Sequence, residues 1–377
     1  MAGPLAGLRV VELAGIGPAP FAGMVLADFG ADVVRVDRPG RPNAMARMEV
    51  LNRGRRSVAV DLKAPGAPDV VVRLAAGADA LIEGFRPGVA ERLGVGPAPC
   101  LAANPRLVYG RMTGWGQHGP YAADAGHDIT YAAVAGALAH IGRAGQPPTP
   151  PLNLVADFGG GGMVLALGVV SALLAAQRTG AGQVVDAAMV DGVALLMAPF
   201  FAGFRSGYFS DDRGTNLLDS GAPFYDCYAC ADGRWVAVGA LEPQFFAALL
   251  AGLGLDPEAI GPQHDRAGWP AMRAGFAAAF ATRDRDAWTR HFAGRDACVA
   301  PVLTTEETFA DPHLAARGTV LDVDGVPQPA PAPRFGATPA ALDRPPPAPG
   351  EHTDEVLAEA GWTAPEITDL RAAGTVA

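Results

Sequence analysis

The chain has 377 residues, half of them hydrophobic, and a formal net charge of −10 at pH 7. This length is sufficient for one large α/β domain and a smaller second domain. The acidic balance excludes a general nucleic-acid binder and a binder of anionic membranes, so an anionic ligand would need a local basic patch. The four cysteines are too few for a disulfide scaffold. Together with a start that lacks the pattern of a secretory signal, they predict a cytoplasmic protein.

Predicted strands and helices alternate through the first half of the chain. Buried-type hydrophobic runs predict strands at 8–13, 31–37, 58–62, 79–85 and 107–114. Helices are predicted at 21–30, 68–75, 127–142 and 159–178, and a strand followed by a helix is predicted at 183–204. This alternation is typical of a Rossmann-like, doubly wound parallel sheet, and we predict one large domain over residues 1–204.

The character of the sequence changes after residue 204. A polar, glycine-rich stretch predicts a linker at 205–220, and two alternating strands around Ala231-Asp232-Gly233 predict a hairpin. Three helices follow, so residues 221–320 are predicted to form a small α+β domain. The remainder, 321–377, is predicted to be a proline-rich return segment with a final helix that packs on the large domain.

One uncharged segment, 158–176, is long enough to cross a membrane. It begins with four glycines directly after Asp157, and no other segment resembles it. We therefore interpret it as a buried core helix of a large soluble protein and predict no membrane span.

Two short motifs favour no cofactor or metal. Gly15-Ile16-Gly17 after a strand, with Asp37 about twenty residues later, resembles a dinucleotide-binding pattern. Pro20 replaces its third glycine, however, and Pro18 and Pro20 remove backbone donors that a pyrophosphate would need. The CxxC at 227–230 has no second ligand pair, so we predict no metal site.

A basic cluster stands out in this acidic chain. Arginines of this kind suit phosphate groups, and ligands of open α/β sheets bind at the carboxyl ends of the strands. A solvated surface is the alternative, but we favour a polyphosphate ligand. The basic residues are Arg53, Arg55, Arg56 and Lys63 within 52–63, with Arg38 and Arg86 after other strands.

A histidine and two acids lie at predicted helix starts. His127 begins the helix predicted at 127–142, and Asp128 is expected to cap that helix. Backbone N–H groups at such a position suit a developing oxyanion. Asp157 begins the next helix, and Glu242 could orient the histidine. The set is a candidate acid–base pair, the alternative being that the aspartates are only caps.

Several ordered blocks between residues 5 and 340 resemble the class III coenzyme A transferase family and, within it, the racemases that act on 2-methylacyl-CoA. The blocks are ELAGIGPAPFAGMVLADFGADVVRVDRPG, NRGRRSVAVDLK, GRMTGWGQHGPYAADAGHDITYAAVAGAL, PLNLVADFGGGG, GAPFYDCYACADGRWVAVGALEPQF and CVAPVLTTEETFADPHLAARG. The resemblance implies a Rossmann-like large domain, a smaller domain and an interlocked homodimer. The active site would lie between the large domain of one subunit and the small domain of the other.

The resemblance also implies an activity. The substrate would be an acyl-CoA thioester whose α-proton is moved between two faces through an enolate, with no separate cofactor. The alternative within the family is CoA transfer with Asp157 as nucleophile. His127 disfavours transfer, and so does GALEPQF, which stands where transferases tend to carry a glycine-rich loop.

The resemblance assigns roles to individual residues. His127 and Asp157 would carry the protons, and Glu242 would pair with the histidine. The residues expected around the thioester are Gly126, Asp128, Tyr131 and Asn153. The residues expected to contact CoA are Arg38, Val60, Asp61, Leu62, Lys63 and Arg86.

Overall fold

The computed structural model describes residues 3–40 and 48–377. The chain forms two compact units. The first unit comprises Met1–Ala135, Pro151–Leu196 and Gly318–Ala377, and the second comprises Gly136–Pro150 and Met197–Arg317. The chain therefore passes between the units more often than the predicted boundaries at 204, 220 and 320 imply.

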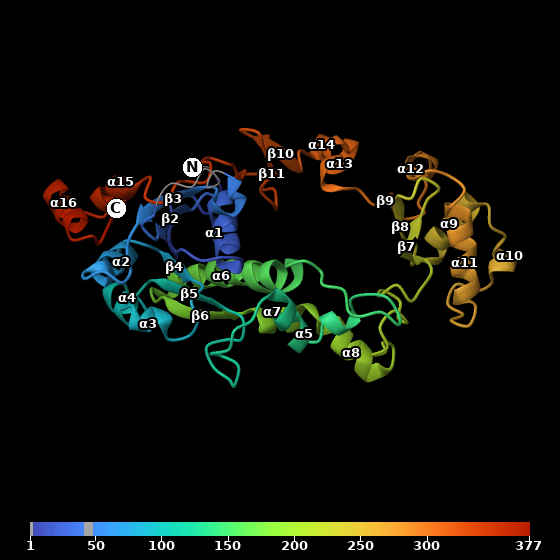
Figure 1. Cartoon of the computed structure of the whole chain (residues 1–377), viewed down its shortest axis with the longest axis horizontal. Coiled ribbons are helices and arrows are strands. Elements are labelled where there is room, and N and C mark those ends of the chain that lie inside the picture. Colours follow the sequence, from blue (N-terminus) through green and yellow to red (C-terminus); the bar gives the residue numbers. More distant parts are fainter. Residues whose placement is uncertain (1–2, 41–47) are drawn as a thin grey trace. The chain divides into compact units, whose positions relative to one another are not determined.

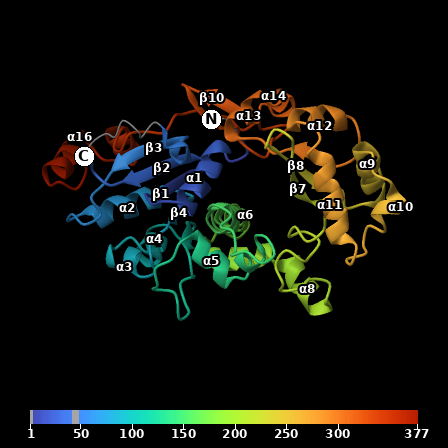
Figure 2. The ribbon, with the colours of Figure 1, turned by 45° about the vertical axis from the view of Figure 1, so that its right-hand side comes forward.

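The first unit is built on a six-stranded, fully parallel sheet (Figures 1 and 2). Its strand order, β3-β2-β1-β4-β5-β6, is that of a Rossmann-like sheet, as predicted. The strand order reverses between β1 and β4, which is where such sheets bind ligands. The strands are β1 (Arg9–Leu13), β2 (Asp32–Asp37), β3 (Arg55–Ala59), β4 (Ala80–Glu83), β5 (Val108–Thr113) and β6 (Gln183–Ala188).

Helices cover both faces of this sheet, which explains why most of its strands read as continuous hydrophobic runs. Helices α1 (Pro18–Asp28) and α6 (Met163–Thr179) pack together on one face. The helices that contribute to the core on the other face are α2 (Ala67–Ala76), α3 (Val89–Arg92), α4 (Pro97–Ala103), α15 (Thr353–Glu359) and α16 (Ala364–Ala372). The return segment also forms a hairpin of β10 (Val320–Val323) and β11 (Val326–Pro329).

Among the predicted elements whose bounds differ in the structure, three bear on the site. The helix expected at 127–142 is the short α5 (Asp128–Val134), since Gly136 adopts a positive φ of 89°, and a 3₁₀ turn (η3, Leu138–His140) follows. The helix expected at 159–178 begins earlier, as the π-helix η4 (Leu154–Gly162), and continues as α6. Strand β3 begins at Arg55 rather than at Val58.

By length and composition, Leu154–Thr179 could cross a membrane, as could the bent pair of α7 (Met189–Leu196) and α8 (Ala198–Ser206) among the described residues. Such a test is also passed by core helices of soluble proteins. Leu165 and Val169 of α6 are fully buried, and α6 packs on β5 and β6. Helix α6 thus serves as a core helix of the first unit.

The second unit holds a three-stranded antiparallel sheet of β7 (Tyr225–Ala229), β8 (Trp235–Gly239) and β9 (Val299–Pro301). The hairpin between β7 and β8 turns at the predicted Ala231-Asp232-Gly233. The helices that follow β8 are α9 (Pro243–Leu253), α10 (Pro257–Ile260), α11 (Trp269–Phe280), α12 (Arg285–Phe292), α13 (Thr305–Ala310) and α14 (Pro312–Arg317). Aromatic side chains of α9, α11 and α12, together with Phe224, fill the core of the unit.

Two polar contacts explain why the second unit extends beyond its predicted limits. The Asp226 carboxylate is buried and accepts hydrogen bonds from Arg143, at 2.7 Å, and from Arg273. This attaches residues 136–150 to the second unit. The stretch predicted as a linker is an ordered turn in the same unit, where Asn216 N–H donates to Asp219 Oδ1 at 2.7 Å.

Candidate active site

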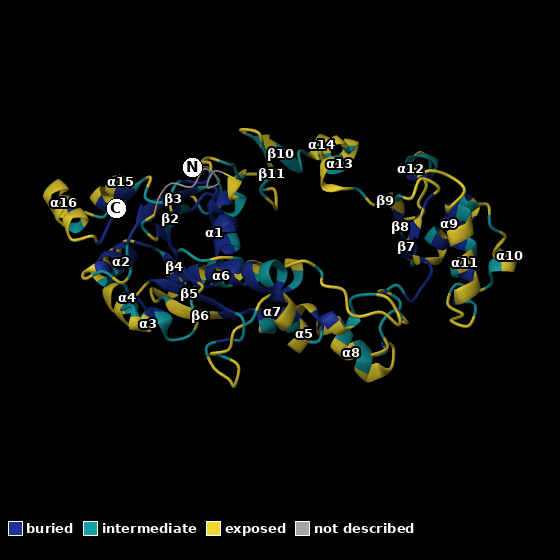
Figure 3. Cartoon of the chain, viewed as in Figure 1, coloured by how far each residue is buried: buried dark blue, intermediate teal, exposed yellow. Residues whose placement is uncertain are grey.

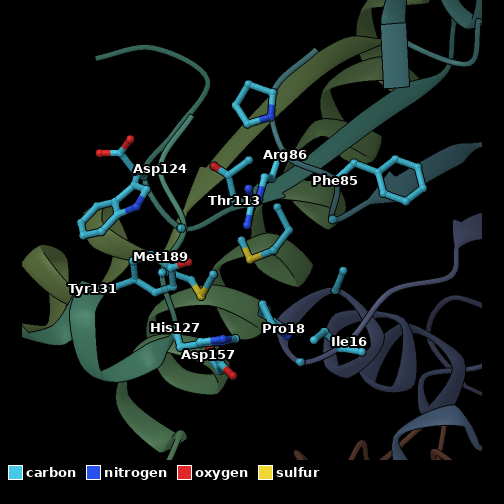
Figure 4. A pocket seen from close by; sticks show the side chains of 18 of the residues that line it. Ile16, Pro18, Phe85, Arg86, Thr113, Asp124, His127, Tyr131, Asp157 and Met189 are labelled. Atoms are coloured by element: carbon cyan, nitrogen blue, oxygen red, sulfur yellow. The ribbon is translucent and has the colours of Figure 1, made fainter. Parts of the chain in front are cut away.

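A cavity of about 460 Å³ opens in the first unit at the carboxyl ends of the central strands (Figure 4). Residues 16–19 after β1, 84–87 after β4 and 112–115 at the carboxyl end of β5 line it, together with residues from the starts of α5, η4 and α7. The cavity therefore lies where the strand order of the sheet reverses, the position at which this kind of fold binds ligands. The predicted site residues that line it are Arg86, Gly126, His127, Tyr131, Asn153 and Asp157.

His127 is the N-cap residue of α5, and its side chain reaches the cavity. The backbone N–H of His127 donates to Thr130 Oγ1 at 3.0 Å, and the Thr130 N–H donates back to the His127 carbonyl at 2.8 Å. These reciprocal bonds fix the first turn of the helix. The backbone of His127 is thus held at a defined place, while its side chain stays exposed at the cavity.

Asp157 lies in the first turn of η4, next to His127 in the cavity (Figure 4). Burial raises the pKa of its carboxyl group, the nearby Asp128 charge raises it further, and an Asn153 hydrogen bond and His127 oppose the rise. Asn153 Nδ2 donates to Asp157 Oδ2 at 3.2 Å. Gly17 has a positive φ of 71°, and a Cβ there would lie 3.2 Å from the same oxygen. The site therefore leaves Asp157 room and favours its protonated form more than water does.

The four glycines after Asp157 and Phe158 allow close packing of helices. A Cβ on Gly192 of α7 would lie 1.7 Å from the Gly160 carbonyl oxygen, and one on Gly162 would lie 2.7 Å from the Pro18 carbonyl oxygen. Neither position accepts a larger residue without backbone movement. The run thus brings α7 and α1 against η4, whose π geometry is frequent at functional sites.

Asp128 does not cap α5, so that prediction is wrong. It is the first residue inside the helix, and its side chain turns to η4 instead. Its Oδ1 accepts the backbone N–H groups of Ala156 at 2.8 Å and Asp157 at 2.7 Å. Asp128 is 6% exposed and is absent from the cavity lining, so its carboxylate supports the site from behind.

An aromatic and apolar wall completes the cavity, and of its residues only Tyr131 is among those predicted from the sequence. Trp115 packs edge-on against Tyr131, with ring centroids 4.8 Å apart, and Met112 and Met189 contribute further apolar surface. No motif marks the other residues. Their one available signal is position, because Met112 and Trp115 lie at the carboxyl end of a predicted strand.

The Tyr131 ring explains the glycine before His127. A Cβ on Gly126 would lie 2.5 Å from this ring, and one on Gly114 would lie 2.1 Å from it. Burial raises the pKa of the Tyr131 hydroxyl, and the Asp157 charge adds to this while Arg86 opposes it. The absence of a side chain at Gly126 therefore allows the Tyr131 ring to pack beside the two candidate proton carriers.

The structure does not bring every predicted residue to this cavity. Glu242 is the N-cap residue of α9 in the second unit, and its pairing with His127 stays a prediction. Arg38 is exposed after β2, Val60 is 1% exposed, and Leu62 packs at the edge of the core. The other two residues expected to contact CoA, Asp61 and Lys63, are hydrogen-bonded to each other, since the Lys63 backbone N–H donates to Asp61 Oδ1 at 3.1 Å. Their contacts with CoA also stay predictions.

The prediction that the 53–56 arginines bind a polyphosphate is wrong. Arg53 pairs with Asp28 at 2.6 Å, Arg55 with Glu12 at 3.0 Å and Arg56 with Asp32 at 2.6 Å, and all three arginines are at most 4% exposed. The reason is the true start of β3, which places Arg55 and Arg56 at the amino end of a parallel strand. Ligands bind at the opposite edge of such a sheet.

The residues of the dinucleotide-like pattern likewise have structural roles. Gly17 precedes α1 and makes the turn, and Pro18 and Pro20 lie in the first turn of that helix. Asp37 is buried, and its Oδ2 accepts a hydrogen bond from Ser57 Oγ at 2.6 Å. Asp37, the acid that would bind the ribose of a dinucleotide, is therefore hydrogen-bonded to a neighbouring strand instead.

Comparison with known proteins agrees with this architecture. The model of CoA-transferase family III matches residues 5–353. Alpha-methylacyl-CoA racemase of Mus musculus is 49% identical over 97% of this chain and 96% of its own length, and that of Homo sapiens is 47% identical over the same shares. A CAIB/BAIF family protein from Brucella suis has a solved structure with a TM-score of 0.83 and 29% identity, covering 96% of this chain and 100% of that one. The chain belongs to CoA-transferase family III.

Proposed function

We propose that the protein is an α-methylacyl-CoA racemase that interconverts the (R) and (S) forms of 2-methylacyl-CoA thioesters. The observation that carries this proposal is the pairing of His127 and Asp157, which begin two neighbouring helices and face one cavity (Figure 4). They lie in a chain that is about half identical to two racemases along nearly its whole length. One base and one acid in one cavity are what a 1,1-proton transfer requires.

The chemistry follows from the weak acidity of the α-proton of a thioester. His127 removes this proton from one face to form an enolate, and Asp157 delivers a proton to the other face. In the reverse direction the two residues exchange roles. Each group must therefore act as acid and as base near neutral pH, and the raised pKa of Asp157 serves this requirement.

The enolate oxygen needs hydrogen-bond donors. We place it against the backbone N–H of Asp128 at the start of α5, beside Gly126 and Tyr131. Asn153 acts on the acid, because its side chain holds the Asp157 carboxylate. Glu242 is proposed to hold the imidazole in its reactive tautomer and to stabilise the imidazolium.

The two ends of the substrate differ in chemistry. The CoA phosphates are proposed to contact Arg38, Lys63 and Arg86, which are exposed cations near carboxyl ends of strands. The acyl chain is proposed to lie on the apolar surface of Ile16, which is 85% exposed, and Met189.

CoA transfer is the second candidate within the family. It would use the Asp157 carboxylate as a nucleophile that forms an acyl anhydride with the substrate. The exposed His127 beside Asp157 favours racemisation, because transfer gives this histidine no role.

Incubation of one 2-methylacyl-CoA epimer with the protein in D₂O, without an acyl acceptor, tests the proposal. Mass spectrometry follows α-deuterium and chiral analysis follows the epimer ratio. We expect deuterium uptake with conversion toward both epimers. Absence of exchange, with acyl transfer once a free acid is added, would instead establish the transferase. Absence of both activities would leave a CoA-binding role. In a separate incubation with added NAD, a change in nicotinamide absorbance would indicate a dehydrogenase.

We further propose that the protein forms an interlocked homodimer. Helix α6 exposes Met163, Leu167 and Leu174 at 45%, 67% and 58% on one face. Helix α8 has no buried residue and is drawn in the colours of exposed and intermediate residues in Figure 3. Exposed apolar surfaces of this kind mark interfaces. Light scattering after size exclusion should give twice the 38.6 kDa chain mass, and Leu167→Glu should lower that value. A wild-type mass of one chain would contradict the dimer.

A further inference from the structure

The Asp128 carboxylate connects the two residues that are proposed to carry protons. Asp128 follows His127 directly in the chain, and its Oδ1 accepts the backbone N–H of Asp157 at 2.7 Å. One peptide bond and one hydrogen bond therefore join the backbones of His127 and Asp157. Asp128 is 6% exposed, so water does not compete for this bond.

Asp128 also serves as the cap of a helix to which it does not belong. The first π-type hydrogen bond of η4 runs from Phe158 N–H to the Asn153 carbonyl, so the N–H groups of Ala156 and Asp157 have no acceptor within the helix. Asp128 Oδ1 accepts both. Asn153, the N-cap residue of η4, makes no side-chain cap bond and holds the Asp157 carboxylate instead. Asp128 thus positions the backbone of Asp157, and Asn153 positions its side chain.

The second carboxylate oxygen of Asp128 shows that capping is not its whole role. Oδ2 is buried and has no hydrogen-bond partner among the described residues. A buried carboxylate oxygen without a donor costs free energy, and a neutral asparagine could accept the same two N–H groups through its amide oxygen. The charge does act on a neighbour, because Asp128 is among the groups that raise the pKa of Asp157.

We propose that Asp128 is a positioning residue for proton transfer, which holds Asp157 at a fixed distance from His127 and presents a negative charge to it. The inference rests on the proposed racemase function. The two proton carriers must reach opposite faces of one α-carbon, and a displacement of about 1 Å costs roughly 100-fold in rate. The hydrogen bonds of the buried Asp128 side chain to the backbone of η4 limit such displacement.

Two substitutions separate the geometric part from the charge. Asp128→Ala removes the acceptor and the charge, whereas Asp128→Asn keeps an acceptor oxygen and removes only the charge. The matched control is Asp69→Asn, since Asp69 also lies in the first turn of a helix but is exposed on α2. All four proteins are compared by α-deuterium exchange and by inversion of each epimer in D₂O, after circular dichroism has shown that they are folded.

If Asp128→Ala makes Asp157 more mobile, α-deuterium exchange and inversion of the epimer should no longer change together. In Asp128→Ala we expect inversion to fall about 100-fold, with a much smaller change in KM for the acyl-CoA. From the epimer that His127 deprotonates, exchange should persist better than inversion, because the histidine can return a solvent deuteron to the same face. A generally damaged fold would lower both together. Asp69→Asn should match the wild type.

Asp128→Asn tests the charge through the pH profile of kcat. The groups that face Asp157 are His127 and Tyr131 from α5, Asn153 from η4 and, beyond Tyr131, Arg86, and all four stay in place. Loss of the negative neighbour lowers the pKa of Asp157, so the acidic limb of the profile should move to lower pH. The control variant should leave this limb where it is.

The outcomes are distinguishable. A wild type that shows neither exchange nor inversion would overturn the proposed function and this inference with it. A wild type that racemises, together with an Asp128→Ala variant of equal rate and equal exchange-to-inversion ratio, would overturn the inference alone. If Asp128→Ala does not fold, Asp128→Asn decides the matter, and an unmoved acidic limb would then contradict the role of the charge.

Discussion

Two polar clusters in the first unit differ in how far their charges are satisfied. At the amino end of β3, Arg53 and Arg55 meet buried carboxylates at 2.6 and 3.0 Å. At the carboxyl edge of the sheet, His127 is exposed, and Asp157 receives one amide hydrogen bond at 3.2 Å. Saturated, buried charges hold elements together, whereas partly satisfied groups on a cavity retain the capacity to bind or transfer a proton. The difference between the clusters predicts which substitutions lower activity and which lower stability.

The largest expected effect follows loss of either proton carrier. His127→Ala and Asp157→Ala should each lower the racemisation rate by at least about 10³-fold, because each removes one of the two groups that exchange a proton with the α-carbon. Deuterium exchange and chiral analysis measure the loss. The thermal midpoint of unfolding should stay close to that of the wild type, since neither residue belongs to a buried ion pair among the described contacts. A rate near that of the wild type in either variant would exclude the assignment.

The next effect concerns stability. Arg55 and Glu12 are both fully buried, and burial raises the pKa of Glu12 while Arg55 opposes this. Arg55→Ala would leave the buried Glu12 carboxylate without its hydrogen-bonded cation, with only Arg35 at 3.8 Å beside it, so the free energy of unfolding should fall by about 3 kcal/mol in urea titrations.

A surface ion pair of similar length provides the control for this experiment. Arg371 lies 2.7 Å from Asp354, but the two side chains are 41% and 71% exposed. Arg371→Ala should therefore cost less than about 1 kcal/mol. Equal losses in the two variants would show that burial does not distinguish the pairs and would weaken the contrast between the clusters.

Much of the fold could be predicted from local pattern. Continuous hydrophobic runs marked the parallel strands, and alternation marked the hairpin around 231–233. The helix at 127–142 was too long because its apolar composition outweighed Gly136, whose positive φ ends the helix. The second unit gains 136–150 through Arg143 and Asp226, a contact across 83 positions that no local pattern contains. Helices and strands could be predicted from residues close together in sequence, whereas the boundaries of the two units depend on contacts between residues far apart in sequence.

The candidate site shows the same limit. Their position at helix starts makes His127 and Asp157 candidates, the family resemblance assigns their roles, and the structure places both on one cavity. The role expected of Asp128 was wrong, because its partners are the backbone N–H groups of η4, 28 and 29 positions away. The prediction for the arginine run is wrong for a different reason: β3 begins three residues earlier than expected, which places the cluster at the amino edge of the sheet. Charge density alone could not distinguish buried pairs from a phosphate site.

The smallest expected effect tests a cation that the buried pairs do not use. Arg38 follows β2 at the carboxyl end and is exposed, unlike Arg55 at the amino end of β3. If it contacts a CoA phosphate, Arg38→Ala should raise KM for the acyl-CoA about 10-fold, since a charge-assisted hydrogen bond contributes roughly 1.5 kcal/mol. The change in kcat should stay within about two-fold, because the phosphate contact is equal in the ground state and the transition state. Steady-state kinetics separates the two constants. An unchanged KM would remove Arg38 from the CoA site, and a lower kcat at constant KM would show that it acts on the reacting centre instead.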